Sequence, residues 1–182
     1  MKENQNLFRD LQEDFRKMKK NLLVAQSGGP TAAINATLAG VIKQAIKEEQ
    51  IDQVYGACYG IQGVLEQKFV NLTEKVDTEE KLEKLKRTPA AALGSCRFKL
   101  NDIKEDDSQY QEIVDILHKM NIGYFVYIGG NDSMDTVAKL SAYCKEKGVE
   151  DIKVIGGPKT IDNDLCGIDH CPEIGRASCR ER

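Results

Sequence analysis

The chain has 182 residues, of which 41% are hydrophobic and 30% are charged, and its formal net charge at pH 7 is −3. This composition is typical of an ordinary globular domain, and the charge gives no general attraction to nucleic acid or to membrane surfaces. No apolar run reaches the roughly 18 residues of a membrane span, and residues 1–20 lack the apolar core of a signal peptide, so we expect a cytoplasmic protein with no nucleic-acid or membrane partner.

The first half of the chain predicts two strand and helix pairs followed by a further helix. Residues 21–26 are an apolar run that ends in a glycine-containing turn, which is typical of a buried strand. Residues 31–49 have apolar residues at helical spacing, which predicts one buried face: Ile34, Leu38, Val41, Ile42, Ala45 and Ile46. We expect a second strand at 52–60, a short helical turn and a small strand within 61–72, and a helix at 77–88 with an aspartate or threonine cap.

The second half continues the same alternation. A loop of small residues at 89–100 precedes an amphipathic helix at 106–120, whose inward side chains are predicted to be Ile113, Ile116 and Leu117. Residues 123–130 form a near-continuous apolar run, as in a central parallel strand. A helix at 133–148, closed by a glycine, leads to a further strand at 151–157.

Strands and helices therefore alternate four times, which predicts an α/β fold: a mostly parallel open sheet with helices on both faces. The folded domain is expected at 21–172, after an N-terminal extension at 1–20 in which Met18 is a plausible start of translation. Six cysteines without a CxxC pair are expected to be free thiols. Cys166, His170 and Cys171 lack the spacing of a standard zinc site.

Three of the predicted strands end in glycine-containing loops, and in open parallel sheets ligands bind beyond the carboxyl ends of the strands. The first loop, SGGPT, contains Gly28 and Gly29, which leave backbone N–H groups open to an anion at the start of a helix. A tight turn without a ligand explains these glycines equally well. The second loop, IGGNDSMDT, brings Asn131, Asp132 and Ser133 to a helix start, where they either cap the helix or offer oxygen ligands to Mg²⁺.

The third loop, GGPKTIDND, is the most specific. Asp162 and Asp164 would share one face of an extended segment, so that one could accept a proton while the other helps to hold a metal. Lys159 brings a compact positive charge that suits phosphate, although turns stabilised by aspartate and asparagine side chains would also explain the pattern. Arg97, in the loop LGSCRF, could bind two phosphate oxygens, but a lone surface arginine is common.

Taken together and in this order, the segments SGGPTAAINAT, LGSCRF, GGNDSM and PKTIDND resemble the phosphofructokinase family over roughly residues 21–172. The resemblance implies the Rossmann-like N-terminal domain of a phosphofructokinase and phosphoryl transfer to the 1-hydroxyl of D-fructose 6-phosphate. Asp162 resembles the base that takes the hydroxyl proton. Thr160 and Asp164 resemble residues that line the sugar and metal side.

The resemblance also bears on the phosphoryl donor. ATP-using members usually have glycine where this chain has Asp132 and Lys159, which is similar to the pyrophosphate-dependent branch. A carboxylate at Asp132 would close the space of a nucleotide's α-phosphate, and Lys159 would stabilise charge on the transferred group. The implied catalytic residues are Asp162, Lys159 and Asp132, and the implied pyrophosphate contacts are Gly28, Gly29, Arg97, Asp132, Ser133 and Lys159.

Mg²⁺ is the cofactor that the resemblance implies, with ligands expected among Asn131, Asp132 and Asp164. The family's usual first aspartate of the metal loop is Asn131 in this chain. A neutral amide oxygen is a weaker ligand than a carboxylate, so Asp132 or Asp164 could take over its role.

The implied reaction is a reversible step of glycolysis in a cytoplasmic homo-oligomer, with pyrophosphate and fructose 6-phosphate as partners. Two alternatives within the family stay open: an ATP-dependent 6-phosphofructokinase and a non-catalytic regulatory subunit. A dinucleotide-binding oxidoreductase is disfavoured because no GxGxxG motif follows the first strand. The family continues past TIDND with a second domain, so we expect an N-terminal fragment that is inactive alone. Residues 173–182, EIGRASCRER, are interpreted as the translation of a sequencing adapter.

Overall fold

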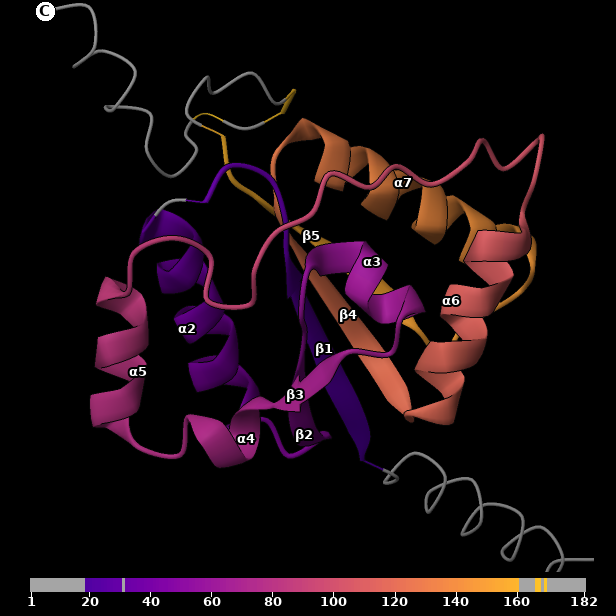
Figure 1. The fold of residues 1–182 in the computed structure, drawn as a ribbon. Helices are drawn as coiled ribbons and strands as arrows, with labels where there is room; N and C mark the ends of the chain where they lie inside the picture. Colours follow the sequence, from indigo (N-terminus) through magenta and orange to yellow (C-terminus); the bar gives the residue numbers. More distant parts are fainter. Residues whose placement is uncertain (1–18, 31, 161–165, 168, 170–182) are drawn as a thin grey trace, which may run out of the picture.

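The computed structural model describes residues 19–30, 32–160, 166–167 and 169 (Figure 1). Within this part of the chain, five strands form one sheet in the order β3-β2-β1-β4-β5. Their bounds are β1 (Lys20–Gln26), β2 (Ile51–Ala57), β3 (Phe69–Asn71), β4 (Ile122–Gly129) and β5 (Lys153–Pro158). β1 pairs in parallel with β2 and β4, β4 pairs in parallel with β5, and β3 is antiparallel to β2. The predicted mostly parallel sheet is therefore confirmed.

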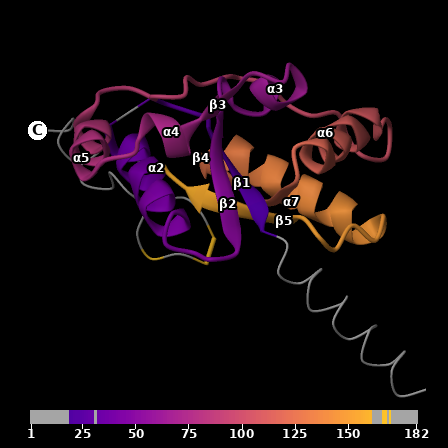
Figure 2. The ribbon, with the colours of Figure 1, turned by 90° about the horizontal axis from the view of Figure 1, so that it is seen from below.

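Helices cover both faces of the sheet, as predicted. Their bounds are α2 (Ala32–Ala45), α3 (Gly60–Leu65), α4 (Leu72–Lys75), α5 (Glu79–Arg87), α6 (Ser108–Lys119) and α7 (Asn131–Glu146). Figures 1 and 2 show α2, α4 and α5 on one side and α3, α6 and α7 on the other. The chain thus forms three layers, with one hydrophobic core on each side of the sheet.

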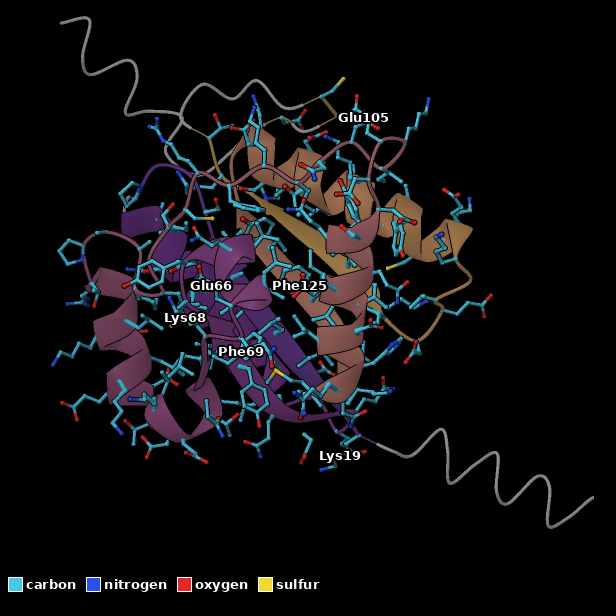
Figure 3. The ribbon with its side chains drawn as sticks, turned by 45° about the vertical axis from the view of Figure 1, so that its right-hand side comes forward. Lys19, Glu66, Lys68, Phe69, Glu105 and Phe125 are labelled. Carbon is cyan, nitrogen blue, oxygen red and sulfur yellow. The ribbon has the colours of Figure 1, made fainter. Side chains whose placement is uncertain are left out.

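The central strand β1 supplies both cores because successive side chains of a strand point to opposite faces. Leu23 and Ala25 belong to the core under α6 and α7, whereas Leu22 and Val24 belong to the core under α2. Phe125 on β4 is fully buried in the first of these cores, between α3 and α6 in Figure 3. This burial on both faces explains why the central strands are nearly continuous apolar runs.

One part of the predicted core is wrong. Four of the six residues assigned to the apolar face of α2 are fully buried: Ile34, Leu38, Ile42 and Ala45. Ile46, however, is 51% exposed. The helix ends at Ala45, so that the helical spacing no longer determines where the next side chain points.

Two further boundaries differ from the predictions. The strand expected at 52–60 ends at Ala57, because Tyr59 and Gly60 adopt left-handed backbone angles, with φ of 65° and 63°, and start α3. The short helix α4 follows β3 directly and was not predicted; Asn71 caps it by accepting a hydrogen bond from the backbone N–H of Glu74.

The remaining helices agree with the sequence. The side chain of Thr78 caps α5 by accepting a hydrogen bond from the backbone N–H of Lys81, and Ile113, Ile116 and Leu117 of α6 are buried. The four cysteines of the described part, Cys58, Cys96, Cys144 and Cys166, are free thiols. None of the described helices is both long and apolar enough to cross a membrane.

Candidate active site

A hollow of about 750 Å³ opens at the carboxyl ends of β1 and β4. Three segments line it: residues 27–30 after β1, residues 95–99 of the long loop between α5 and α6, and residues 130–133 with Thr136 at the start of α7. Tyr127 of β4 completes the lining. This is the edge of the sheet where the sequence predicted ligand binding.

Two fully buried amide side chains bring the long loop to this edge. Gln26, the last residue of β1, donates from Nε2 to Asn35 Oδ1 at 3.0 Å and to the backbone carbonyl of Ile34 at 3.2 Å. Its Oε1 accepts from the backbone N–H of Leu93 at 2.9 Å. A single side chain therefore joins the end of a strand, the first turn of α2 and a loop that is distant in sequence.

Asn35 extends this network to the rest of the loop. Its Nδ2 donates to the carbonyls of Thr88 at 2.8 Å and Ala90 at 2.6 Å, and its Oδ1 accepts from the backbone N–H of Ala92 at 2.9 Å. Because Oδ1 also accepts from Gln26, the hydrogen-bonding capacity of the Asn35 amide is fully used. Buried polar groups that are satisfied in this way fix one loop conformation.

Two serines then hold the loop against the turn after β1. Ser95 Oγ donates to the carbonyl oxygen of Gly28 at 2.7 Å, and Ser27 Oγ donates to the carbonyl oxygen of Cys96 at 3.1 Å. These reciprocal bonds place Arg97 at the hollow beside the glycine turn.

The glycines at and beside the hollow differ in their surroundings, and so in what a side chain at each position would meet. Gly28 has a φ of +83°, and a Cβ there would lie 3.4 Å from the backbone nitrogen of Gly130. A Cβ on Gly129 would lie 2.2 Å from Ser133 Oγ, so no larger residue fits where β4 meets α7. Gly29 has open space where a Cβ would be, so the backbone there is accessible from the hollow.

Asn131, Asp132 and Ser133 occupy the first turn of α7, and the residue at the N-cap is Gly130. The alternative in which Asn131 or Ser133 merely caps this helix is therefore wrong. Ser133 is buried, while Asn131 and Asp132 are exposed. The carboxylate of Asp132 lies 3.2 Å from Lys99 Nζ, and both side chains are more than three-quarters exposed, at 78% and 77%.

The floor of the hollow carries a tyrosine that the sequence reasoning missed. Tyr127 is 1% exposed, its hydroxyl oxygen accepts from the backbone N–H of Ile61 at 3.3 Å, and its ring stacks on Phe125. Burial raises the pKa of Tyr127 to about 12. The floor therefore stays uncharged at neutral pH and does not repel an anion.

Six of the predicted site residues line the hollow together: Gly28, Gly29, Arg97, Asn131, Asp132 and Ser133. Lys159 and Thr160 do not line it. They follow β5 and are buried, and the backbone N–H of Lys159 donates to the carbonyl of Gly129 at 2.7 Å. Asp162 and Asp164 lie outside the described residues. Lys99 was missed, although its position two residues after Arg97 in a loop at the site was a usable signal.

The start of α7 offers few of the oxygen ligands that a metal ion needs. Among the described residues, no group of three or more histidine, cysteine, aspartate or glutamate side chains could hold an ion. The hollow offers the carboxylate of Asp132 and the amide of Asn131. Mg²⁺ commonly takes one or two protein carboxylates and completes its shell with waters and substrate phosphates, so these residues fit magnesium that is shared with a phosphate ligand.

A model of one protein family, described as "Phosphofructokinase", matches residues 21–182. The pyrophosphate--fructose 6-phosphate 1-phosphotransferase of Xanthomonas campestris pv. campestris (strain B100) is 42% identical over 158 residues, which are 87% of this chain and 37% of the relative. The enzyme of that name from Rhodospirillum rubrum is 43% identical over 160 residues, with 88% and 38% covered. The chain thus spans somewhat more than a third of the length of these relatives.

A solved structure supports the same likeness. The pyrophosphate-dependent phosphofructokinase from Nitrosospira multiformis matches with a TM-score of 0.77 and 39% identity, over 86% of this chain and 38% of that one. At this level of identity and coverage, the arrangement of strands and loops described above is that of a known fold.

The first prediction concerns the buried amide network. Asn35→Ala removes the partners of Thr88, Ala90 and Ala92 and of Gln26, so we expect the free energy of unfolding to fall by about 3 kcal/mol. Urea unfolding followed by circular dichroism measures the change. Thr37→Ala in the same helix is the control, because its hydroxyl donates only to the carbonyl of Ala33, and we expect a change within about 0.5 kcal/mol. Equal effects of the two variants would contradict the role of the network.

The second prediction concerns the raised pKa of Tyr127. The neutral hydroxyl stabilises the fold at pH values below the ordinary pKa of 10.0, and this stabilisation is lost as the pH rises toward about 12. In an alkaline titration followed by tyrosinate absorbance, we expect the difference between the wild type and Tyr127→Phe to be one step near pH 12. If Tyr127→Phe instead loses part of the absorbance step near pH 10, Tyr127 titrates as a solvent-accessible tyrosine and the prediction is wrong.

Proposed function

The chain belongs to the phosphofructokinase family, and on that premise we propose that the protein transfers a phosphoryl group reversibly from pyrophosphate to the 1-hydroxyl of D-fructose 6-phosphate. The products are fructose 1,6-bisphosphate and phosphate. The observation that carries this proposal is the place of Asp132, a carboxylate at a hollow whose other charged side chains, Arg97 and Lys99, are both cations. The identity of about 40% to relatives named for this reaction supports it.

The choice of donor follows from charge and space at Asp132. Of the charged residues that line the hollow, Arg97 and Lys99 are positive and Asp132 alone is negative. A nucleotide would have to bring its α-phosphate toward this exposed carboxylate, which would repel it. Pyrophosphate has only two phosphates and therefore no group in the place of the α-phosphate, so the Asp132 carboxylate repels it less.

In the proposed chemistry, residues from different loops carry out different steps. Asp162 takes the proton from the sugar hydroxyl, whose oxygen attacks the terminal phosphorus while the bond to the leaving phosphate breaks. Arg97 neutralises charge on the phosphates from its place at the hollow. Lys159 is buried beyond β5, so its proposed contact with the transferred group rests on the resemblance of its motif to that of pyrophosphate users.

We propose Mg²⁺ as the cofactor, held by Asp132 and Asn131 together with Asp164. The metal would neutralise part of the charge of the diphosphate. The sugar phosphate is expected to bind mainly through parts of the protein beyond this chain, since the relatives are more than twice as long. We also propose a cytoplasmic homo-oligomer, which suits a reaction between charged metabolites.

The two alternatives within the family give different results in an assay. An ATP-dependent 6-phosphofructokinase would use ATP and ignore pyrophosphate, and a regulatory subunit would bind ligands without turnover. The acid and the lysine at positions 132 and 159 disfavour the first, and the intact TIDND motif disfavours the second.

The third prediction concerns the donor. In a full-length protein that carries this segment, we expect Asp132→Gly combined with Lys159→Gly to lower kcat/KM for pyrophosphate by about 100-fold or more, because two groups that act on the donor are lost. Lys104→Gly with Glu105→Gly is the matched control, since it removes one base and one acid from an exposed turn (Figure 3). Unchanged kinetics with pyrophosphate, or a wild type that uses only ATP, would reject the proposed donor.

The fourth prediction concerns the base. Asp162→Asn keeps the shape of the side chain but removes the proton acceptor, so we expect kcat to fall by about 10²- to 10⁴-fold in the same full-length protein. Asp135→Asn, on the exposed side of α7, is the control and should leave kcat unchanged within about twofold. Near-normal turnover of Asp162→Asn would exclude Asp162 as the base.

A further inference from the structure

Lys99 is a second cation at the hollow, and the resemblance to the family assigns it no role. It lies on the same segment as Arg97, and both residues line the hollow opposite the start of α7. Its side chain is 77% exposed, so it is accessible to a ligand that enters from solvent.

The backbone around Lys99 is held firmly on both sides. Toward the N-terminus, Ser95 Oγ bonds to Gly28 and the carbonyl of Cys96 accepts from Ser27, as described above. Toward the C-terminus, the hydroxyl of Tyr110 donates to the carbonyl of Asn101 at 2.7 Å. Because the backbone is fixed, only the side chain of Lys99 has to move to reach a different partner.

The partner of Lys99 in this structure is Asp132, at 3.2 Å from Nζ to Oδ1. Since both side chains are more than three-quarters exposed, this ion pair contributes little to stability and is readily exchanged. A lysine has a flexible four-carbon stem and a compact charge, so its ammonium group can move from one anion to another without a change in the backbone.

From this geometry we infer that Lys99 is a phosphate-binding residue of the donor site, which Asp132 holds over the hollow until the diphosphate binds. This inference rests on the proposed function, because it concerns the pyrophosphate site of that function. When a diphosphate enters, Lys99 exchanges the carboxylate for a phosphate oxygen, and Asp132 would then be free to hold a Mg²⁺ ion bound together with the diphosphate. Arg97 and Lys99 together then neutralise an anion whose several charges exceed what one arginine can balance.

A simpler role for Lys99 is to neutralise Asp132 and so reduce its repulsion of the donor. The two roles predict different behaviour when Asp132 is replaced. If Lys99 only screens the carboxylate, its removal has no effect once the carboxylate is gone. If Lys99 binds phosphate, its removal weakens binding whether or not Asp132 carries a charge.

The experiment measures the binding of inorganic pyrophosphate to a full-length protein that carries this segment by isothermal titration calorimetry, with and without Mg²⁺. We expect Lys99→Gln to weaken binding about five- to tenfold, as the loss of one charge-assisted contact at an exposed site predicts. Lys104→Gln, in the exposed turn that follows, makes the same change in net charge outside the hollow and should alter affinity by less than about twofold. Circular dichroism spectra check that each variant is folded like the wild type.

A double-mutant cycle with Asp132→Asn separates the two roles. In the absence of Mg²⁺ we expect Asp132→Asn to tighten pyrophosphate binding, because the carboxylate no longer competes for Lys99. In the Asp132→Asn background, Lys99→Gln should still weaken binding at least fivefold. If its effect disappears in that background, or if Lys99→Gln binds as tightly as Lys104→Gln, the inference is wrong.

The same titrations distinguish this inference from the proposed function. A wild-type chain that binds pyrophosphate, with Lys99→Gln binding equally well, overturns only the role of Lys99. A folded wild-type protein that does not bind pyrophosphate, whether or not it binds ATP, overturns both the proposed donor and the role of Lys99.

Discussion

The arrangement of the site depends on two buried amides, Gln26 and Asn35. The loop between α5 and α6 has no regular secondary structure near the hollow, so strand pairing cannot hold it in place. The two side chains replace that pairing, because they bond to four backbone groups between Thr88 and Leu93. Both amide side chains are fully buried, where an unmet donor or acceptor is costly, so the loop has one favourable position. That position decides where Arg97 and Lys99 lie.

In the hollow, the charged side chains lie at the rim and the floor is uncharged. The floor contains Tyr127, a phenol that is neutral at pH 7 and whose pKa burial raises further, while the charged groups Arg97, Lys99 and Asp132 lie where solvent reaches them. Charged side chains at the rim keep most of their hydration in the empty site, and thus the site does not bear the cost of a buried, unpaired charge. An anion that enters therefore meets cations whose side chains are accessible from solvent.

The sequence predicted the sheet, its faces and six of the residues at the hollow, because strand and helix periodicity and glycine turns are local signals. It failed where local signals end. Ile46 lies just past a helix, and the strand before Tyr59 stops at a left-handed turn that its composition did not indicate. Lys99 directly follows the LGSCRF segment, so its local position was a signal that the prediction did not use. Tyr127 reaches the site only through tertiary contacts, because it lies within β4. The burial of Lys159 was equally hidden, because it depends on how β5 packs beside β4.

Asp132 has three roles in the proposed site: it excludes a nucleotide, holds a metal and retains Lys99. These demands are compatible because they apply to different states of occupancy. In the empty site the carboxylate is paired with Lys99, so it is neither bare nor buried. In the proposed complex with the donor, the metal would meet the charge of Asp132, and the released lysine would add to the positive field on the phosphates. On the proposed function, a glycine in its place would remove all three effects together, so this one position would separate two classes of phosphoryl donor.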